Sequence, residues 1–440
     1  MMKLRLPSAL SIKVAMGFIL TIMGVVIRPI MVVAVLYCFG IVLMDPKRIN
    51  AVCMLFAWLS VSPIFKFGPG TTSLFTYLEL LAIGKLLWVD KTIHKVFLAS
   101  WFAYLTYITV GMGTEYTEYI KTAMLPLLLY LLTKHMCYDY IKKVSFQYIT
   151  GIIVGSLLGL CKEVIPNLKY FVAEYKTVNV SYSHATGFTS EIRFSALWAD
   201  PNYFSVHLVI AISICVILYL RNEIKSYLFY GIYGNMVLFG AMTGSKSFFL
   251  MLIVLTFFLM VGLLRNRQYK QLFILITLVC GALLLMMLGY IDIFSRVFVR
   301  LDRINNGSSD WTTGRMDLWT YYFQEFWNDP FKMFVGNGLE GGFSYRPPHN
   351  TYIDFIDILG IGGTAITIMT ITASYFSVPQ NGKGSRVILL VIAVMYFFLS
   401  MFYAIDLVFE VALAFSFCRI GPAAKVYCEE RADEKSSHSL

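Results

Sequence analysis

Apolar runs alternate with short polar segments along almost the whole chain. Each run approaches the roughly 20 residues that a helix needs to cross a bilayer. The ten-residue alternation that marks an outer-membrane barrel is absent. The pattern predicts an all-α polytopic membrane protein with about fourteen transmembrane helices, in a range of twelve to fourteen. The predicted spans are residues 8–27, 29–44, 49–65, 74–89, 96–113, 118–133, 145–161, 202–220, 226–243, 247–264, 272–294, 351–376, 386–404 and 407–420.

Composition agrees with this pattern. Hydrophobic residues make up 58% of the 440 residues and charged residues only 14%, whereas soluble proteins carry about 25% charged residues. No cleavable signal peptide is expected, because the first apolar run leads directly into the second through Arg28 and Pro29. The cysteines avoid both long polar loops, so we expect neither a disulfide framework nor a cysteine metal site.

The distribution of basic residues predicts the topology. When sides alternate after each span, every short loop on the side of Lys3 and Arg5 is basic, as the positive-inside rule requires. We therefore expect a single integral membrane domain over residues 1–420 with both termini in the cytoplasm. Long external loops would cover 162–201 and 295–350, and 421–440 would be a disordered cytoplasmic tail. The net charge of +10 then reflects topology, and no nucleic-acid partner is expected.

Basic residues in the two long external loops oppose this bias, so topology does not explain them. In the first loop, Arg193 precedes Asp200 and Pro201, which are typical of an N-cap and a first helical residue. The free amide groups of such a helix end favour an anion, and Arg193 is near enough in sequence to share it. The alternative is a capped helix with Arg193 paired to Glu191 or to a lipid headgroup.

The external turn Thr243–Ser247 contains Lys246. Its Gly-Ser-Lys-Ser run is similar to a phosphate loop, but a Walker A loop has glycine immediately before the lysine. The turn also lies on the side of the membrane without ATP, so a nucleotide site is excluded. Lys246 could still meet a lipid phosphate or another anionic group, and ordinary snorkelling to the surface is the alternative.

The second external loop is predicted to contain amphipathic helices. Arg296, Arg300 and Arg303 share a helical face that continues the preceding span outward. A further helix opens at Arg315 and ends before Pro330, and it is expected to lie flat in the membrane interface. Gly336–Gly342 follows as a flexible hinge and lid. The apolar side of the interfacial helix is predicted to consist of Leu318, Trp319, Tyr322, Phe323, Phe326 and Trp327.

The loop ends at Arg346, two prolines and His349, where the next helix begins. His349 is thus expected at the outer membrane surface, on the positive end of a helix. That helix end and Arg346 both disfavour an imidazolium ion, so a neutral His349 could accept a proton. The alternative is a capping histidine that bonds to a carbonyl group.

Asn350, Asp354 and Asp357 share one face of that helix. Aspartates in the outer part of a span are costly unless they face a wet cavity or a partner. Two carboxylates one turn apart are a weak signal for a cation, so we expect chemistry without a metal or cofactor. External cations, one neutral histidine and interfacial aromatic residues suit an amphiphilic substrate with an anionic head and an apolar tail.

Four short segments stand in order within residues 187–363, and Gly336-Asn337-Gly338 lies between the last two. They are Arg193-Phe194-Ser195 with Pro201-Asn202, Thr243-Gly244-Ser245-Lys246, Gly314-Arg315 with Trp319, and His349-Asn350 with Gly360-Ile361-Gly362-Gly363. This series resembles the O-antigen ligase and O-antigen polymerase superfamily, whose pattern ends in HN-x9-GxxG. Lys246 departs from it, because the family has an arginine there and a lysine cannot make arginine's bidentate phosphate contact.

The resemblance implies a GT-C-like membrane glycosyltransferase in the bacterial inner membrane. It would act at the periplasmic face on an undecaprenyl-pyrophosphate-linked glycan, without metal or cofactor. His349 would be the catalytic base. The residues that would bind pyrophosphate or glycan are Arg193, Arg315, Arg346, Lys246, Asn202 and Asn350.

Within that family we predict a Wzy-type polymerase, which joins lipid-linked repeat units into O-antigen, capsule or exopolysaccharide. A chain-length regulator would be a partner besides the lipid bilayer. The alternative is an O-antigen ligase that transfers the same donor to lipid A core. A polysaccharide flippase is less favoured, because the acidic residues within spans are mainly Glu79 and Glu410 and the basic cluster lies at one face.

Overall fold

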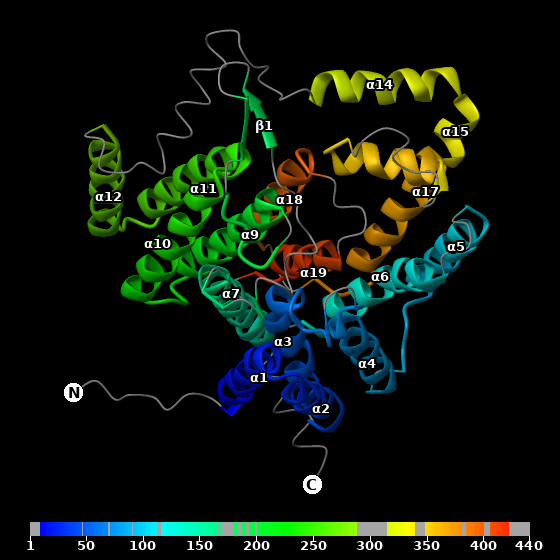
Figure 1. Cartoon of the computed structure of the whole chain (residues 1–440), viewed down its shortest axis with the longest axis horizontal. Helices are drawn as coiled ribbons and strands as arrows, with labels where there is room; N and C mark the ends of the chain where they lie inside the picture. The colour runs from blue at the N-terminus through cyan, green and yellow to red at the C-terminus, as the bar shows by residue number, and fades with distance from the viewer. Residues whose placement is uncertain are drawn as a thin grey trace. The chain divides into compact units, whose positions relative to one another are not determined.

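The computed structural model describes most of the chain and shows helices from one end to the other (Figure 1). The chain divides into two compact units, Met1–Ile93 with Lys134–Asp200 and His94–Thr133 with Pro201–Leu440. Most of the predicted tail lies outside the described residues. The structure describes residues 9–45, 47–68, 71–89, 91–111, 116–136, 138–162, 164–165, 167–168, 180–183, 187–190, 193–198, 200–287, 315–338, 348–380, 384–399 and 405–421.

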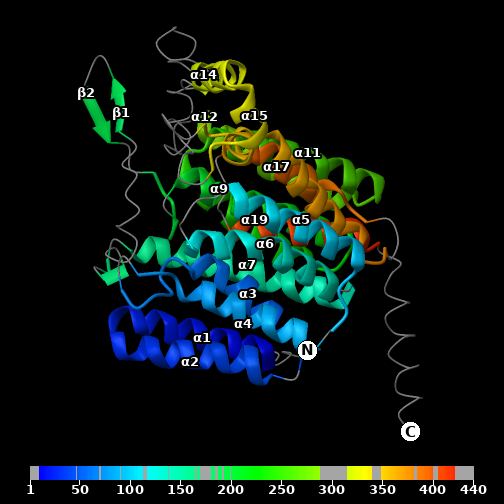
Figure 2. The same ribbon diagram turned by 90° about the vertical axis from the view of Figure 1, so that its right-hand side faces the viewer.

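The first unit is built from six helical segments and one short hairpin in its described part. They are α1 (Ala9–Val26), α2 (Arg28–Met44), α3 (Arg48–Trp58), the 3-10 turn η1 (Leu59–Val61), α4 (Leu74–Val89), α7 (Tyr138–Cys161), β1 (Val180–Ser183) and β2 (Gly187–Ser190). The strands pair antiparallel, with Val180 opposite Ser190. Figure 2 shows α1 and α2 packed side by side. Pro29 lies in the first turn of α2, where its missing N–H costs no hydrogen bond.

Small residues let the helices of this unit approach closely. A Cβ atom at Gly151 of α7 would lie 2.4 Å from the carbonyl oxygen of Ala57 in α3. The Trp58 ring fills the space over Gly17 of α1 and stacks on Phe18, with ring centroids 4.5 Å apart. Close approach of backbones is the usual way in which apolar helices gain packing energy in a membrane.

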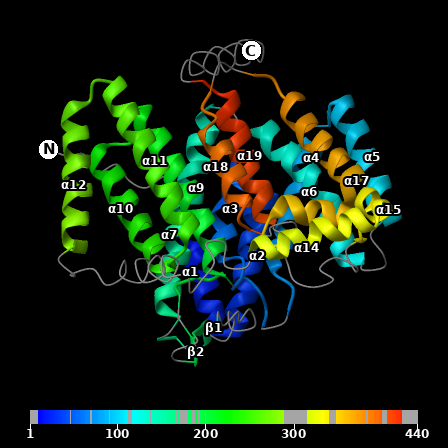
Figure 3. The same ribbon diagram turned by 90° about the horizontal axis from the view of Figure 1, so that it is seen from above.

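The second unit is organised around α9. Every side chain from Phe204 to Tyr219 is buried, as expected for a helix that is apolar on all sides. Helices α10, α11 and α18 pack against α9, and α18 also packs on α19 (Figure 3). The described elements of this unit are α5 (Lys95–Gly111), α6 (Tyr116–His135, whose last two residues belong to the first unit), α9 (Pro201–Leu220), α10 (Ser226–Thr243), α11 (Lys246–Arg265), α12 (Tyr269–Met287), α14 (Arg315–Asn328), α15 (Pro330–Val335), α17 (Thr351–Phe376), α18 (Val387–Tyr396) and α19 (Ile405–Arg419).

Each of the fourteen predicted spans contains a helix. The largest differences within the described residues are at α3, which ends at Trp58 rather than at residue 65, at α7, which begins at Tyr138 rather than at 145, and at α18, which ends at Tyr396 rather than at 404. Within the part of the chain that the structure describes, four helices are long and apolar enough to cross a membrane, namely Tyr140–Cys161, Pro201–Leu220, Lys246–Arg265 and Thr351–Phe376. The structure therefore supports a helical membrane protein, whereas the number of crossings stays a prediction.

The surface of α11 has the character of a lipid-facing helix. One side of the helix is buried against the unit, including Leu255 and Leu259. The other side exposes Leu250, Ile253 and Phe257, the last two at 68% and 66%. Apolar side chains that lie exposed along such a helix are stable in a hydrocarbon environment, where polar ones would be costly.

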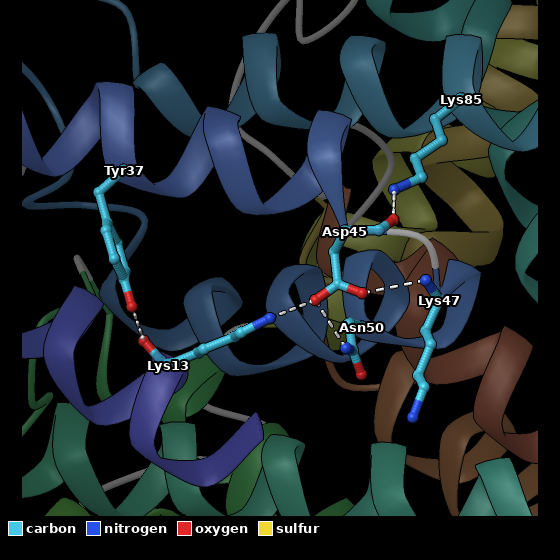
Figure 4. A network of polar contacts seen from close by, with 6 residues as sticks. All are labelled: Lys13, Tyr37, Asp45, Lys47, Asn50 and Lys85. Atoms are coloured by element: carbon cyan, nitrogen blue, oxygen red, sulfur yellow. Dashed lines mark hydrogen bonds and ion pairs between the residues drawn. The ribbon is translucent and has the colours of Figure 1, made fainter. Parts of the chain in front are cut away.

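Asp45 ties together the ends of four helices in the first unit (Figure 4). It follows α2 and is 7% exposed. Its carboxylate accepts hydrogen bonds from Lys13 Nζ at 2.5 Å, Asn50 Nδ2 at 2.9 Å and the Lys47 N–H at 3.0 Å. Its backbone carbonyl accepts one from Lys85. Lys85 of α4 thereby joins the residues around Asp45.

We predict that the contacts of Asp45 stabilise the protein less in acid. Burial raises the pKa of Asp45, but the hydrogen bonds from its partners outweigh burial and lower that pKa to about 2, against about 3.9 in an unfolded chain. The unfolded chain therefore binds more protons between about pH 4 and pH 2, so stability falls as the pH drops through this window. Asp45→Asn should cost about 2 kcal/mol at neutral pH and remove this part of the pH dependence. Thermal unfolding in detergent across the pH range tests both effects, and a variant with unchanged acid sensitivity would contradict them.

Candidate functional site

The helix α17 is interrupted at Gly360, whose φ of 64° and ψ of 177° are not helical. Such a conformation is essentially restricted to glycine. A Cβ atom at Gly360 would lie 2.2 Å from the carbonyl oxygen of Phe334, and one at Gly336 would lie 2.3 Å from that of Ile358. The two glycines thus let the end of α15 and the break in α17 touch backbone to backbone. Both belong to the short motifs identified in the sequence.

Polar groups fix this contact. The backbone N–H of Asn337 donates to the Asp357 carbonyl at 2.7 Å, and its side-chain Nδ2 donates to Asp357 Oδ1 at 2.8 Å. The Tyr107 hydroxyl of α5 lies 2.9 Å from the Val335 carbonyl and 2.7 Å from the Leu359 carbonyl. These bonds satisfy backbone carbonyl groups that the break in α17 would otherwise leave without a hydrogen bond. They also argue against the predicted flexible hinge at Gly336, while residues 339–342 of that hinge lie outside the described part of the chain.

His349 precedes the first half of α17 in a left-handed backbone conformation, with a φ of 50°, and its side chain is exposed. The next residue, Asn350, is the N-cap: its Oδ1 accepts hydrogen bonds from Tyr352 N at 3.0 Å and Ile353 N at 3.3 Å. The predicted start of the helix at Thr351 is therefore confirmed. The buried Asn350 caps the helix, so it has a structural role besides its predicted role in the site. The side chain of His349 lies at the surface.

Helix α14 holds the residue before His349. The indole N–H of Trp319 donates to the Pro348 carbonyl at 2.8 Å, and its ring meets Phe397 edge to face at 5.1 Å. Arg315, half-buried, lies one helical turn before Trp319. Residues one turn apart share a helix face, so Arg315 lies on the side of α14 that reaches the start of α17.

The predicted helix at Arg315–Asn328 is confirmed, but its apolar side is divided between two surroundings. Tyr322 and Phe326 are buried against Ile353 of α17. Phe323 and Trp327, one position further round, are 58% and 84% exposed. One stripe therefore packs on protein, and only the neighbouring stripe is available to a membrane interface.

Asp354 and Asp357 point into the protein, where they are 0% and 1% exposed. Burial, together with the negative charge of these two carboxylates, raises the pKa of the Tyr322 phenol. Among the described residues, no group of three or more His, Cys, Asp or Glu side chains could hold a metal ion.

Lys246 and Asn202 lie at the same end of the second unit. The Ser205 hydroxyl donates to the Asn202 carbonyl at 2.6 Å and lies 3.2 Å from the hydroxyl of Ser245. Ser245 occupies the N-cap position of α11, directly before the exposed Lys246. Helix α9 begins at Pro201, as predicted. This end of α9 is linked to α17 through α18, which packs on α9.

Two hydrogen bonds make that link. The Thr351 hydroxyl donates to the Leu399 carbonyl at 2.5 Å, and the Tyr352 hydroxyl donates to the Ala393 carbonyl at 2.9 Å. The end of α18 is thereby fixed to the first turn of α17, next to His349. The structure thus connects the surroundings of His349, Asn350 and Arg315 with those of Asn202 and Lys246 within one unit.

The remaining predicted residues are placed differently. Arg193 is half-buried and belongs to the first unit. Its segment packs closely on Gly159 of α7, since a Cβ atom at Gly159 would lie 2.4 Å from Ala196 Cα. Lys162 donates to the Ala196 carbonyl at 3.2 Å. Arg346 lies outside the described residues.

A buried polar triad was missed in the sequence. His207 Nδ1 of α9 lies 2.7 Å from Glu410 Oε1 of α19, both side chains are 0% exposed, and the Tyr396 hydroxyl of α18 donates to Glu410 Oε2. Glu410 stood out as an acid within a predicted span, but nothing in the sequence pairs it with a histidine about two hundred residues away. The triad gives that buried carboxylate the compensation that it needs in an apolar core.

We predict that Gly360→Ala destabilises the protein by more than about 3 kcal/mol, because it combines a strained left-handed residue with a backbone clash. Gly362→Ala is the matched control: its Cβ would lie 3.2 Å from Phe334 O and needs no left-handed backbone, so the loss should stay below about 1 kcal/mol. Thermal unfolding in detergent compares the two. Equal melting temperatures for Gly360→Ala and the unsubstituted protein would show that the break in α17 is dispensable.

No family model matches the chain, and neither a curated protein nor a solved structure matches it. The resemblance to the O-antigen ligase and polymerase superfamily is therefore carried by the short segments quoted above. An activity for the chain is accordingly a proposal drawn from those segments and from the geometry of the site.

Proposed function

We propose that the chain is a membrane glycosyltransferase that polymerises undecaprenyl-pyrophosphate-linked oligosaccharide units. The observation that carries this proposal is the presentation of His349. Its side chain is exposed, its backbone is fixed by Asn350 on one side and Trp319 on the other, and Arg315 lies on the adjoining helix face. A fixed, accessible imidazole beside a cation suits proton transfer to and from an anionic substrate.

The proposed reaction joins a sugar hydroxyl of one lipid-linked unit to C1 of the sugar on another. The new C1–O bond forms as the bond between C1 and the pyrophosphate oxygen breaks, and His349 takes the proton of the attacking hydroxyl. Negative charge develops on the leaving pyrophosphate, and positioned cations stabilise it. Each charge-assisted contact contributes about 1.5–3 kcal/mol. ATP is not required, because the donor carries its own leaving group.

In this proposal Arg193, Arg315, Arg346 and Lys246 bind the pyrophosphate, and Asn202 contributes near Lys246. The fourteen helices would be membrane spans of a bacterial inner-membrane protein with cytoplasmic termini. The end of α9 that carries Asn202 and the start of α17 would face the periplasm. The exposed aromatic side chains of α14 would then lie at the depth of the lipid headgroups, where an undecaprenyl donor presents its pyrophosphate.

We predict that His349→Asn removes most of the turnover while leaving donor binding nearly intact. Asparagine accepts the left-handed backbone at this position, so the change removes the base without adding strain. The loss of a positioned base should lower kcat by about 10²–10⁴. The measurement is a reconstituted reaction with a defined lipid-linked repeat, read as oligomer ladders on a gel, together with donor affinity. His94→Asn is the control, since His94 is also exposed and also stands directly before a helix.

The same assay separates the related activities. Ladders from the lipid-linked repeat alone support the polymerase. Transfer only to lipid A core, without ladders, would replace the polymerase with an O-antigen ligase that uses the same site. Full activity of His349→Asn would contradict the role of His349 in either case.

We also predict that Trp319 acts as a positioning residue. Trp319→Phe keeps the ring against Phe397 but removes the indole N–H that holds the Pro348 carbonyl, so kcat should fall by about tenfold. The KM for the donor should stay within a factor of about two, because the change removes no substrate contact. An increase in KM at unchanged kcat would instead assign Trp319 to donor binding.

A further inference from the structure

An open groove lies between two loops at the far end of the second unit, one between α9 and α10 and the other between α11 and α12. Its volume is about 680 Å³, within the range of small-ligand sites. Helices α9 and α11 each run about 30 Å from the end that carries Asn202 and Lys246 to this groove. The groove is therefore separate from the site proposed above. Its lining includes Tyr219, Lys225, Ser226, Arg267, Gln268 and Lys270.

The two loops, which together frame the groove, have the same structure because α9 and α11 end in the same way. Asn222 and Arg267 are left-handed, with φ of 59° and 55°. The Glu223 N–H donates to the Leu218 carbonyl and the Gln268 N–H to the Leu263 carbonyl, both at 2.9 Å. This is the Schellman motif at both helix ends.

The loops are also bonded to each other. Asn266 Nδ2 donates to the Leu220 carbonyl at 3.2 Å, and Gln268 Nε2 donates to Asn222 Oδ1 at 3.1 Å. The floor of the groove is thus preorganised, so a ligand would not have to order it.

Arg267 is the unusual member of the frame. The left-handed position of a Schellman motif normally takes glycine or asparagine, and the sister loop has asparagine there. An arginine costs backbone energy at such a position, whereas its side chain gains nothing from the turn itself. An exposed Arg267 on the groove wall is what a site for an anion would require.

Charge and aromatic residues indicate which anion. The groove lining contains three basic residues, Lys225, Arg267 and Lys270, and one acidic residue, Glu223. Tyr269 on the wall is 61% exposed, and exposed tyrosines beside basic residues mark headgroup depth in membrane proteins. Basic pockets between membrane helices bind anionic lipid headgroups. We propose that this groove binds the phosphate of an anionic phospholipid in the leaflet opposite to the one that would hold the glycan donor.

The test uses the whole purified protein and native mass spectrometry during a titration with phosphatidylglycerol. Arg267→Asn copies the sister loop and should lower the affinity for the first bound lipid by about tenfold, the loss of one charge-assisted contact. It should not lower the melting temperature, because asparagine suits the left-handed backbone. Arg265→Gln is the matched control: Arg265 ends the same helix and is not part of the lining, so its affinity should change by less than about twofold.

Three outcomes would overturn the proposal. The first is unchanged phosphatidylglycerol affinity in Arg267→Asn. The second is binding of phosphatidylcholine with the same acyl chains as tightly as phosphatidylglycerol, because charge would then have no part in it. The third is displacement of the lipid by millimolar inorganic phosphate, which would assign the groove to free phosphate. The choice of leaflet rests on the proposed function, whereas lipid binding at the groove needs only a helical membrane protein and is measured without the glycosyltransferase activity.

Discussion

The backbone contact between Gly336 and Gly360 is the constraint on which the candidate site depends. It joins α15 to the break in α17, and Tyr107 of α5 closes the same point from the other side. Three segments therefore meet at this point, and two of them touch where no Cβ atom would fit. The first half of α17 becomes a short rigid piece, fixed at this contact and at its N-cap. The position of His349 follows from both ends.

Helix positions were predictable from the sequence because an apolar run of sufficient length has few alternatives to a helix in a membrane. Caps were partly predictable for the same local reason, as Asn350 and the start of α9 show. Contacts between distant segments were not. The bond from Trp319 to Pro348 and the contact between Gly336 and Gly360 depend on how helices pack, and helical periodicity contains no such information. Periodicity likewise marked one apolar side on α14, although packing divides it in two.

The predicted cations are distributed over both units of the chain. Arg315 and Lys246 belong to the second unit and Arg193 to the first. Within the second unit, the bonds from Trp319 and Thr351 fix the surroundings of His349 before any substrate is bound, so the charges of Arg315 and Lys246 are part of the same preorganised unit as the proposed base. The part given to Arg193 rests on the sequence resemblance.

The buried pairing of His207 with Glu410 has a consequence for how the chain is made. Synthesis proceeds from the N-terminus, so α9 is complete long before α19 leaves the ribosome. Until then the imidazole of His207 lies in a mostly apolar helix without the carboxylate that it contacts in the finished protein. The central helix of the second unit therefore reaches its final surroundings only when the last helix arrives, and a chain that stops short of α19 carries an unmatched polar group at its centre.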